Sequence, residues 1–471
     1  MKNNTFDYVI IGAGIVGASI FSALARSGKS VCVVDKALDV ATGASKANSG
    51  LVHAGFDPEP NTLKAKLNVL GNKMFPSEAK RLGLPIKKAG AYVVGNDTKK
   101  LQELLARGRK NGVDALTIVS GAELHQRLPM LNADIQHALF AENAYIISPY
   151  MFTICLVEEG IVNGGEVALG YEPKKIRKIG EYYVISDGFA EIKAKFVINS
   201  AGHGYNEIAN MLGSEIYEIE YRRGEYYVLD STEKDLVPAT IFPLPTKAGK
   251  GVLVTPTIDG NILVGPNSEP SDESTKTTAS GLAFVSSQAK LTIPSVNLKK
   301  TIRIFAGIRT IVGDDFVIEK SGQVQNVINI AGICSPGLSS APAIALYVLN
   351  LLGISTNIPK SAVRITPYQS MACLSRAKQN ELIKKDPSYG RIVCKCEGVS
   401  EGEIRDALNR PLRVVSVDGI KRRTRTGMGR CQSGFCLSRT IELIAKENNM
   451  SEYDVTKENK GSNILVGEVK K

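Results

Sequence analysis

The sequence of 471 residues predicts an α/β protein, and two observations at the N-terminus carry this prediction. An apolar run over residues 8–11 leads through Gly12-x-Gly14-x-x-Gly17 into an apolar helix. A second apolar strand then ends in Asp35, eighteen residues after the last of these glycines. A strand, a Gly-rich turn, a helix and a strand with a terminal acid together begin a Rossmann-like domain.

Each glycine of the turn has a mechanical reason. Gly12 permits the tight turn, Gly14 lets the backbone approach a pyrophosphate, and Gly17 lets the helix pack on the strand. Free N–H groups at the helix start favour a negative charge, and Asp35 is placed to accept hydrogen bonds from ribose hydroxyls. We therefore expect a dinucleotide to contact Gly12, Ala13, Gly14, Ile15, Val16, Gly17, Asp35 and Lys36.

The position of this motif favours FAD over NAD. It starts near residue 8, and a second glycine-rich segment near residue 332 can serve as its distant partner beside the flavin ring. Small residues over 36–56, which let a backbone pass close under a flat cofactor, and small residues after the buried strand 195–199 fit the same picture. Further cofactor contacts are expected from Ser45, Asn48, Ser49, Gly50, Ser200, Ala201, Gly202, Gly307, Arg309, Ser335, Pro336, Gly337 and Leu338.

A separate antiparallel sheet is predicted inside this first domain. Strand-like runs at 222–229, 251–256 and 262–266 alternate in character, and Gly260-Asn261 supplies a hairpin turn. We expect residues 61–130 to be mainly helical. The predicted division is a FAD-binding part at about 1–75, 150–212 and 303–360, and a substrate part at about 76–149 and 213–302. A linker at 361–390, a small, mostly α-helical module at 391–450 and a polar, frayed tail at 451–471 complete the chain.

Composition narrows the class of protein. The chain is 43% hydrophobic and 22% charged, as in globular proteins, and no apolar run is long enough for a membrane span. No signal peptide is recognised, so we expect a reducing, cytoplasmic compartment. The net charge of +11 comes without nucleic-acid motifs, and it indicates anionic substrates, cofactors or acidic partners.

Four of the eight cysteines fall at ligand-like spacing late in the chain, as Cys394-x-Cys396 and Cys431-x4-Cys436. Four thiolates are the complement that a 2Fe–2S cluster needs. Zinc also accepts four cysteines, but its usual arms are C-x2-C to C-x4-C pairs, and a disulfide framework does not suit a cytosolic chain. The basic run 421–425 between the two pairs is a solvated face, a docking patch or a tuning charge for the cluster.

These motifs resemble a known family. The chain from about residue 5 to 355 resembles the FAD-dependent D-amino-acid-oxidase (DAO) superfamily, and within it bacterial glycerol-3-phosphate dehydrogenases and oxidases, with L-2-hydroxyglutarate dehydrogenases as near cousins. The late module resembles the 2Fe–2S domain of bacterioferritin-associated ferredoxin (BFD), which anaerobic glycerol-3-phosphate dehydrogenases also carry. The motifs that carry the resemblance are the Gly loop, 48–55, 223–227, 305–309 and 335–338.

The resemblance implies roles for individual residues. His53 is expected to remove the hydroxyl proton of an alcohol beside the flavin, although it could instead only shape the flavin pocket. Arg309 implies a planar cationic contact for a phosphate or carboxylate. Lys250, between glycines, either contacts the same anion or is a solvated turn residue, and Ser49 and Ser335 are expected polar contacts to flavin or substrate.

The expected activity is oxidation of sn-glycerol 3-phosphate to dihydroxyacetone phosphate, with FAD and a 2Fe–2S cluster as cofactors. The electron acceptor would be a second flavoprotein or a quinone-linked subunit. A 2-hydroxy acid such as L-2-hydroxyglutarate is an alternative substrate, and amine oxidation is a more distant one. A non-catalytic electron-transfer subunit is the other class, but a relay needs neither a base like His53 nor an anion clamp.

Overall fold

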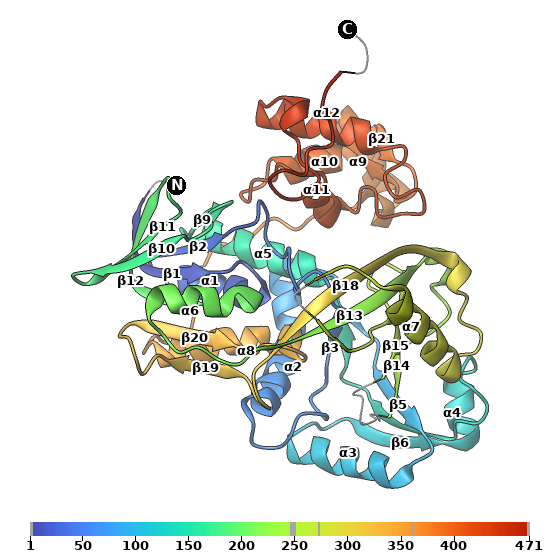
Figure 1. Cartoon of the computed structure of the whole chain (residues 1–471). Coiled ribbons are helices and arrows are strands. Elements are labelled where there is room, and N and C mark those ends of the chain that lie inside the picture. Colours follow the sequence, from blue (N-terminus) through green and yellow to red (C-terminus); the bar gives the residue numbers. More distant parts are fainter. Residues whose placement is uncertain (1–2, 245–250, 272–273, 359–361, 469–471) are drawn as a thin grey trace.

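The structure is a computed structural model that describes residues 3–244, 251–271, 274–358 and 362–468 (Figure 1). It confirms the predicted α/β class. The first sheet has a parallel centre in which β1 lies between β12 and β2, with β9 beyond β2 and β20 beside β12. Its strands are β1 (Thr5–Ile11), β2 (Val31–Asp35), β9 (Glu166–Leu169), β10 (Lys175–Ile179), β11 (Tyr182–Ser186), β12 (Glu191–Asn199), β19 (Val317–Lys320) and β20 (Val327–Ala331).

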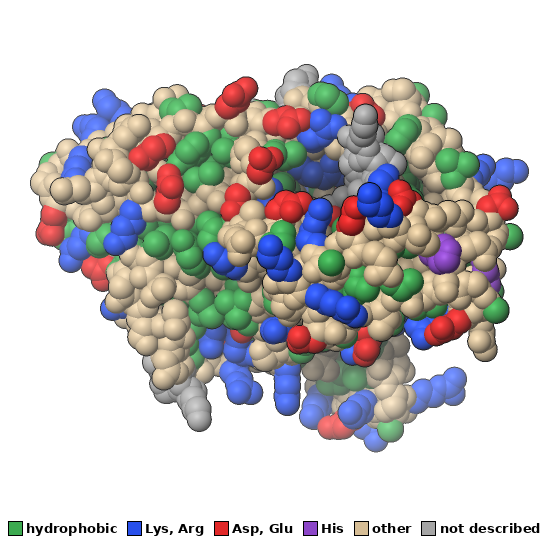
Figure 2. Space-filling view, turned by 90° about the horizontal axis from the view of Figure 1, so that it is seen from below, with side chains coloured by type: hydrophobic (Ala, Val, Ile, Leu, Met, Phe, Trp, Pro, Cys, Tyr) green, Lys and Arg blue, Asp and Glu red, His purple; other side chains and the backbone are tan. Residues whose placement is uncertain are grey.

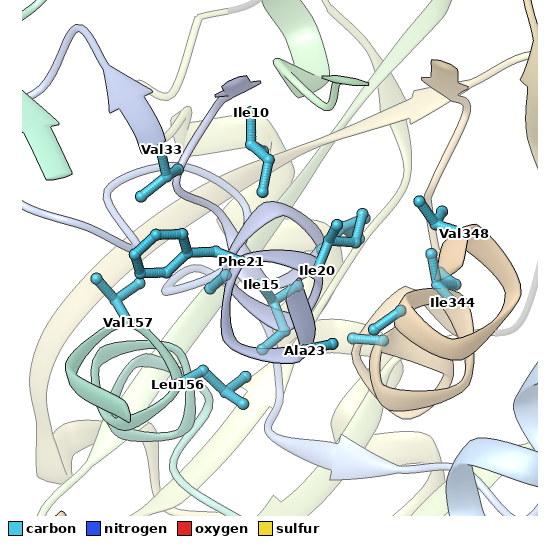
Figure 3. Close-up of a cluster of buried hydrophobic side chains, with 14 of the residues drawn as sticks. Ile10, Ile15, Ile20, Phe21, Ala23, Val33, Leu156, Val157, Ile344 and Val348 are labelled. Atoms are coloured by element: carbon cyan, nitrogen blue, oxygen red, sulfur yellow. The ribbon is translucent and has the colours of Figure 1, made fainter. Parts of the chain in front are cut away.

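Three helices pack side by side against the first sheet. The helix α1 (Ile15–Arg26) lies between α5 (Pro149–Val162) and α8 (Gly337–Leu351), as Figure 3 shows. Phe21 and Ile20 are fully buried at the two sides of α1, and Gly160 of α5 leaves room for the Phe21 ring. Burying such side chains contributes about 1.5–3 kcal/mol each, so this helix layer fixes the strand ends where the cofactor is expected. The helices α2 (Leu63–Leu82) and α6 (Tyr205–Leu212) complete this part.

A second sheet forms the other half of the body (Figure 1). Its longest pair is β13 with β18, which are antiparallel from Glu220–Ile311 to Leu229–Thr301. The strands are β5 (Ala91–Gly95), β6 (Leu116–Ser120), β7 (His137–Ala141), β13 (Glu220–Leu229), β14 (Thr240–Pro243), β15 (Leu253–Pro256), β16 (Ile262–Gly265), β17 (Glu269–Pro270) and β18 (Thr301–Ile311). The helices α3 (Thr98–Lys110), α4 (Gly121–Arg127) and α7 (Ala279–Thr292) belong to the same half.

The expectation of a mainly helical 61–130 segment was wrong in part. The runs 91–95 and 116–120 are strands of the second sheet, because they pair with the two edges of β7, one run on each side. A small sheet of β3 (Leu51–Val52), β8 (Tyr145–Ile146) and β4 (Lys87–Lys88) joins the two halves of the body.

The C-terminal part sits above α5 and over the boundary between the two halves of the body (Figure 1). It contains α9 (Arg376–Lys385), β21 (Ile392–Cys394), β22 (Val399–Ser400), α10 (Glu401–Leu408), α11 (Val417–Thr424) and α12 (Leu437–Asn448) around its own apolar core. The first part of the tail packs on the module, since Val455 is fully buried and Thr456 pairs with Ser416.

Two surface features bear on function. Within the described ranges, no helix combines the length and apolarity that crossing a bilayer requires. On the face seen in Figure 2, Lys and Arg side chains are interspersed with acidic ones, so the positive charge forms no continuous stripe there.

Candidate active site

Gly12 and Gly17 of the Gly-rich turn after β1 are packed too closely to carry a side chain. Gly12 has a φ of 105°, and a Cβ added there would lie 2.6 Å from the carbonyl oxygen of Ser200. A Cβ on Gly17 would lie 1.9 Å from the carbonyl oxygen of Gly12. The structure therefore brings the segment that begins with Ser200 against the turn, as the cofactor prediction requires.

Two side chains accept hydrogen bonds from N–H groups at or just before the start of α1. The Asp35 carboxylate accepts hydrogen bonds from the N–H groups of Ala13 (2.8 Å) and Ala37 (2.9 Å), and burial raises its pKa. The hydroxyl oxygen of Ser45 accepts from the N–H of Ile15 at 2.8 Å. The first turn of α1 has no acidic residue, so its remaining N–H donors and its dipole fit the pyrophosphate of FAD.

The loop before β3 is held rigidly and lies close to β18. Asn48 donates to the carbonyls of Ala44 and Ser45 at 3.0 Å and accepts from the N–H of Gly50 at 2.9 Å. A Cβ on Gly307 of β18 would lie 2.2 Å from the carbonyl oxygen of Ala47, so only glycine permits this approach.

Arg309 lies two residues beyond Gly307, and therefore on the same face of β18. Its guanidinium donates to the carbonyl of Asn267 (3.0 Å) and the hydroxyl of Ser268 (3.1 Å), and Gly224 on β13 gives it room. No acidic residue among the described ranges forms an ion pair with it. The face directed at the flavin loop thus carries a cation that is held by neutral groups and is available to an anion.

His53 is anchored through its backbone on both sides. Its N–H donates to the hydroxyl of Ser339 (2.7 Å), and its carbonyl accepts from the amides of Asn68 (2.9 Å) and Asn72 (3.1 Å). His53 lines a small pocket together with Pro336, next to the start of α8. The structure thus brings together His53 and the 335–338 segment, of which Ser335 is exposed. Lys250 lies outside the described residues.

Sequence reasoning missed the residues that hold Arg309. Glu225 is fully buried, accepts from the amide of Asn267 at 2.7 Å and also accepts from Thr278. Asn267 in turn supplies the carbonyl that Arg309 contacts. The polar pair Asn267-Ser268 directly after a predicted hairpin strand was the available signal, because polar residues at a strand end often face a ligand.

The four late cysteines are arranged as two pairs. The thiols of Cys394 and Cys436 lie within hydrogen-bonding reach, which lowers the pKa of Cys394 to about 6, and Cys396 forms the same contact with Cys431. In the described part of the chain, no three His, Cys, Asp or Glu side chains are gathered to hold one metal ion. Two thiol pairs fit a cluster with two irons better than one tetrahedral zinc. Gly429 is needed here, since a Cβ on it would lie 2.4 Å from that of Cys396.

The basic run 421–425 is mainly a docking surface between the module and the body. Arg422 and Arg423 both donate to the carboxylate of Asp39, with three contacts of 2.8–2.9 Å in a fully buried position. Arg425 pairs with Asp259 of the second sheet's half at 2.8 Å. The module is therefore attached to both halves of the body.

A second buried ion pair lies at the same boundary. Arg410 of the module donates to both carboxylate oxygens of Glu158 on α5, with distances of 2.6–3.0 Å. Tyr368, in the segment that leads to the module, donates to Glu158 at 2.7 Å and lies under the guanidinium of Arg410.

Comparisons with known proteins agree with this geometry. Residues 7–351 match the model of the FAD dependent oxidoreductase (DAO) family, and residues 392–446 match the BFD-like [2Fe-2S] binding domain. The chain is 42% identical to a glycerol 3-phosphate dehydrogenase of Caloramator mitchellensis, covering 99% of both chains. It is 33% identical to a glycerol 3-phosphate oxidase of Mycoplasma genitalium, covering 74% of this chain and 95% of the relative.

A solved structure shows the same fold for the body. The FAD-bound, dithionite-reduced L-α-glycerophosphate oxidase of Mycoplasma pneumoniae superposes with a TM-score of 0.73 at 29% identity, over 76% of this chain and 98% of that one. The donors at the start of α1 and the two thiol pairs fit FAD and a 2Fe–2S cluster as the cofactors. The chain therefore belongs to the family of FAD dependent oxidoreductases and carries a BFD-like [2Fe-2S] binding domain at its C-terminal side.

Proposed function

We propose that this enzyme is a dehydrogenase that oxidises sn-glycerol 3-phosphate to dihydroxyacetone phosphate and delivers the electrons to a partner. The observation that carries the proposal is Arg309, a cation held by neutral groups on the sheet face directed at the flavin loop. The names of the relatives support the same substrate. A non-catalytic relay would have no use for such a cation.

The reaction removes a hydride from the secondary carbon and a proton from its hydroxyl. When bound, FAD accepts the hydride, and a 2Fe–2S cluster carries electrons onward one at a time. His53 takes the hydroxyl proton, since an imidazole has a pKa near neutrality. The contacts of its backbone with Ser339, Asn68 and Asn72 hold its position against the start of α8.

Arg309 binds the substrate phosphate, and Lys250 is proposed as a second cation for it. The planar guanidinium suits the oxygens of a phosphate, and its remaining contacts are with Asn267, Ser268 and Tyr226. Each charge-assisted contact is worth about 1.5–3 kcal/mol, which corresponds to roughly 10 to 10² in rate or affinity. Ser49 and Ser335 remain proposed polar contacts to flavin or substrate.

The rest of the pathway is proposed at a coarser level. The acceptor of the electrons is a protein, such as a second flavoprotein or a quinone-linked subunit. We place the enzyme in the cytoplasm, where thiols stay reduced and the cysteines remain available as cluster ligands.

Anaerobic stopped-flow reduction of the bound flavin tests the proposal. We expect reduction by glycerol 3-phosphate to be roughly 10² to 10⁴ faster than by glycerol, because two cations hold the phosphate. Arg309→Met should slow the reaction with glycerol 3-phosphate by roughly 10 to 10² and leave glycerol unaffected. Lys299→Met, which removes an exposed lysine, is the matched control.

Two outcomes would contradict the proposal. Equal rates of flavin reduction with glycerol and with glycerol 3-phosphate would contradict the proposed contact between the phosphate and Arg309. Faster reduction by L-2-hydroxyglutarate than by glycerol 3-phosphate would change the substrate to a 2-hydroxy acid and leave the fold and cofactors unaffected.

A further inference from the structure

A cavity of about 250 Å³ lies where the module meets both halves of the body. Its lining includes the 46–50 loop, which holds the expected flavin contacts Asn48, Ser49 and Gly50, and also Met428 and Gln432 of the module. Gln432 directly follows the cluster ligand Cys431. The cavity therefore lies between the two cofactor regions and is separate from the His53 pocket.

Most of the wall is apolar. The side chains come from α5 and its preceding turn, from the β13, β16 and β18 strands, and from the module. They are Ile147, Tyr150, Val228, Leu263, Phe305 and Met428. This mixture of aliphatic and aromatic side chains is typical of small-molecule sites, in which a few polar groups fix the ligand's orientation.

Two cations on the wall have no acidic partner among the described residues. The Lys421 side chain on α11 forms neither a hydrogen bond nor an ion pair with any described residue, and the Arg303 side chain on β18 has, among the same residues, only a hydrogen bond to the Gln432 side chain (3.2 Å). Burial, together with the charge of Arg303, lowers the pKa of Lys421 to about 8. The acids nearby are engaged elsewhere, since Asp418 pairs with Lys457 and Asp259 with Arg425.

Other cations of the wall do have acidic partners. Lys46 and Arg422 share the carboxylate of Glu458, and Arg422 also contacts Asp39. Holding two cations near each other without an anion is unfavourable in a partly buried site, whereas an anionic group between them would relieve the repulsion.

We propose that this cavity binds an anionic ligand with an apolar or aromatic body, whose phosphate, sulfonate or carboxylate group lies between Lys421 and Arg303. The apolar wall receives the body of the ligand, and the two cations fix its charged end. Because the cavity touches both the flavin loop and the segment after Cys431, a ligand here lies between the two cofactors. This inference rests on the cavity and its charges and does not depend on the identity of the substrate.

The probe for this site is 8-anilinonaphthalene-1-sulfonate, an aromatic anion whose fluorescence rises in apolar surroundings. The neutral N-phenyl-1-naphthylamine has a similar ring system without the charge and serves as the paired probe. We expect the holoenzyme to bind the sulfonate saturably. Lys421→Met and Arg303→Gln should each weaken this binding roughly tenfold, the loss of one charge-assisted contact, and leave the neutral probe unaffected.

Two further variants locate the binding. Val228→Trp fills the cavity and should abolish the binding of both probes, whereas Lys299→Gln on an exposed turn should change neither. Flavin and iron contents are measured for each variant to show that the holoenzyme is intact. Unchanged affinity for the sulfonate in both Lys421→Met and Arg303→Gln, or in an intact Val228→Trp protein, would overturn the proposal.

Discussion

Asp39 is the residue whose removal should most clearly loosen the module. Its carboxylate is fully buried and accepts three hydrogen bonds from Arg422 and Arg423, and the Arg423 side chain is also fully buried. Asp39→Asn keeps the shape and removes the charge, which leaves two buried cations without their common partner. Breaking a buried ion pair in this way costs about 3–5 kcal/mol.

The assay is urea unfolding of the holoenzyme, followed by cluster absorbance and by flavin fluorescence, together with limited proteolysis of the 362–390 segment. We expect the cluster transition to move to lower urea and cleavage to accelerate. Glu142→Gln is the control, since its pair with Lys88 is exposed to solvent and contributes little to stability. A cost for Asp39→Asn as small as that of the control would refute the reasoning.

The same ion pair predicts a pH dependence in the unaltered protein. Burial alone would raise the pKa of Asp39, but Arg423 and Arg422 outweigh it and hold the pKa well below its usual value. A carboxylate with a lowered folded-state pKa stabilises the protein fully above its unfolded pKa of about 3.9, and this contribution is lost as pH falls further. When the pH is lowered below about 4, the urea concentration at the midpoint of the cluster transition should therefore decrease. This decrease should be smaller in Asp39→Asn.

Three further predictions concern the cofactor and substrate sites. His53→Ala should slow flavin reduction by roughly 10² to 10⁴ with unchanged FAD content, measured by anaerobic stopped flow; loss of FAD would instead indicate a shaping role. Cys431→Ser should remove the cluster and acceptor-linked turnover, measured by iron analysis and dye reduction, whereas failure of flavin reduction with FAD still bound would contradict a one-way electron path. Gly307→Ala should lower FAD content, measured by absorbance, because its Cβ would lie 2.2 Å from the Ala47 carbonyl oxygen; full FAD occupancy would show that the loop can shift freely.

The sequence was most informative where chemistry is local. The contacts of Gly12, Gly17 and Asp35 follow from the spacing of one strand, one turn and one helix, and the structure shows the close approaches that this spacing implies. The cysteine pairs were also visible, because each pair lies within six residues. The thiol contacts run between these sequence pairs, from Cys394 to Cys436 and from Cys396 to Cys431. Only the fold shows this arrangement.

Long-range electrostatics could not be predicted in this way. From the sequence alone, the basic run 421–425 could equally be a solvated face or a docking surface. Its partner Asp39 lies 383 residues away from Arg422 in the sequence. The strand at 91–95 was missed because its apolar residues become a central strand only when β7 and β14 pair with it. Both features depend on segments that are brought together by the tertiary fold alone.

The position of α1 between α5 and α8 has a consequence for biosynthesis. The apolar sides of this helix, made within the first thirty residues, are covered only by segments that include Leu156 and Ile344. At about 5–20 residues per second, the ribosome needs on the order of 15 to 60 s between the synthesis of the first and the last of these elements. During that interval α1 exposes a surface that chaperones for nascent chains bind, so production of the enzyme should depend more on chaperone supply than its folded stability suggests. Asp39 stays without its arginine partners for longer still, because Arg422 is synthesised 383 residues after it.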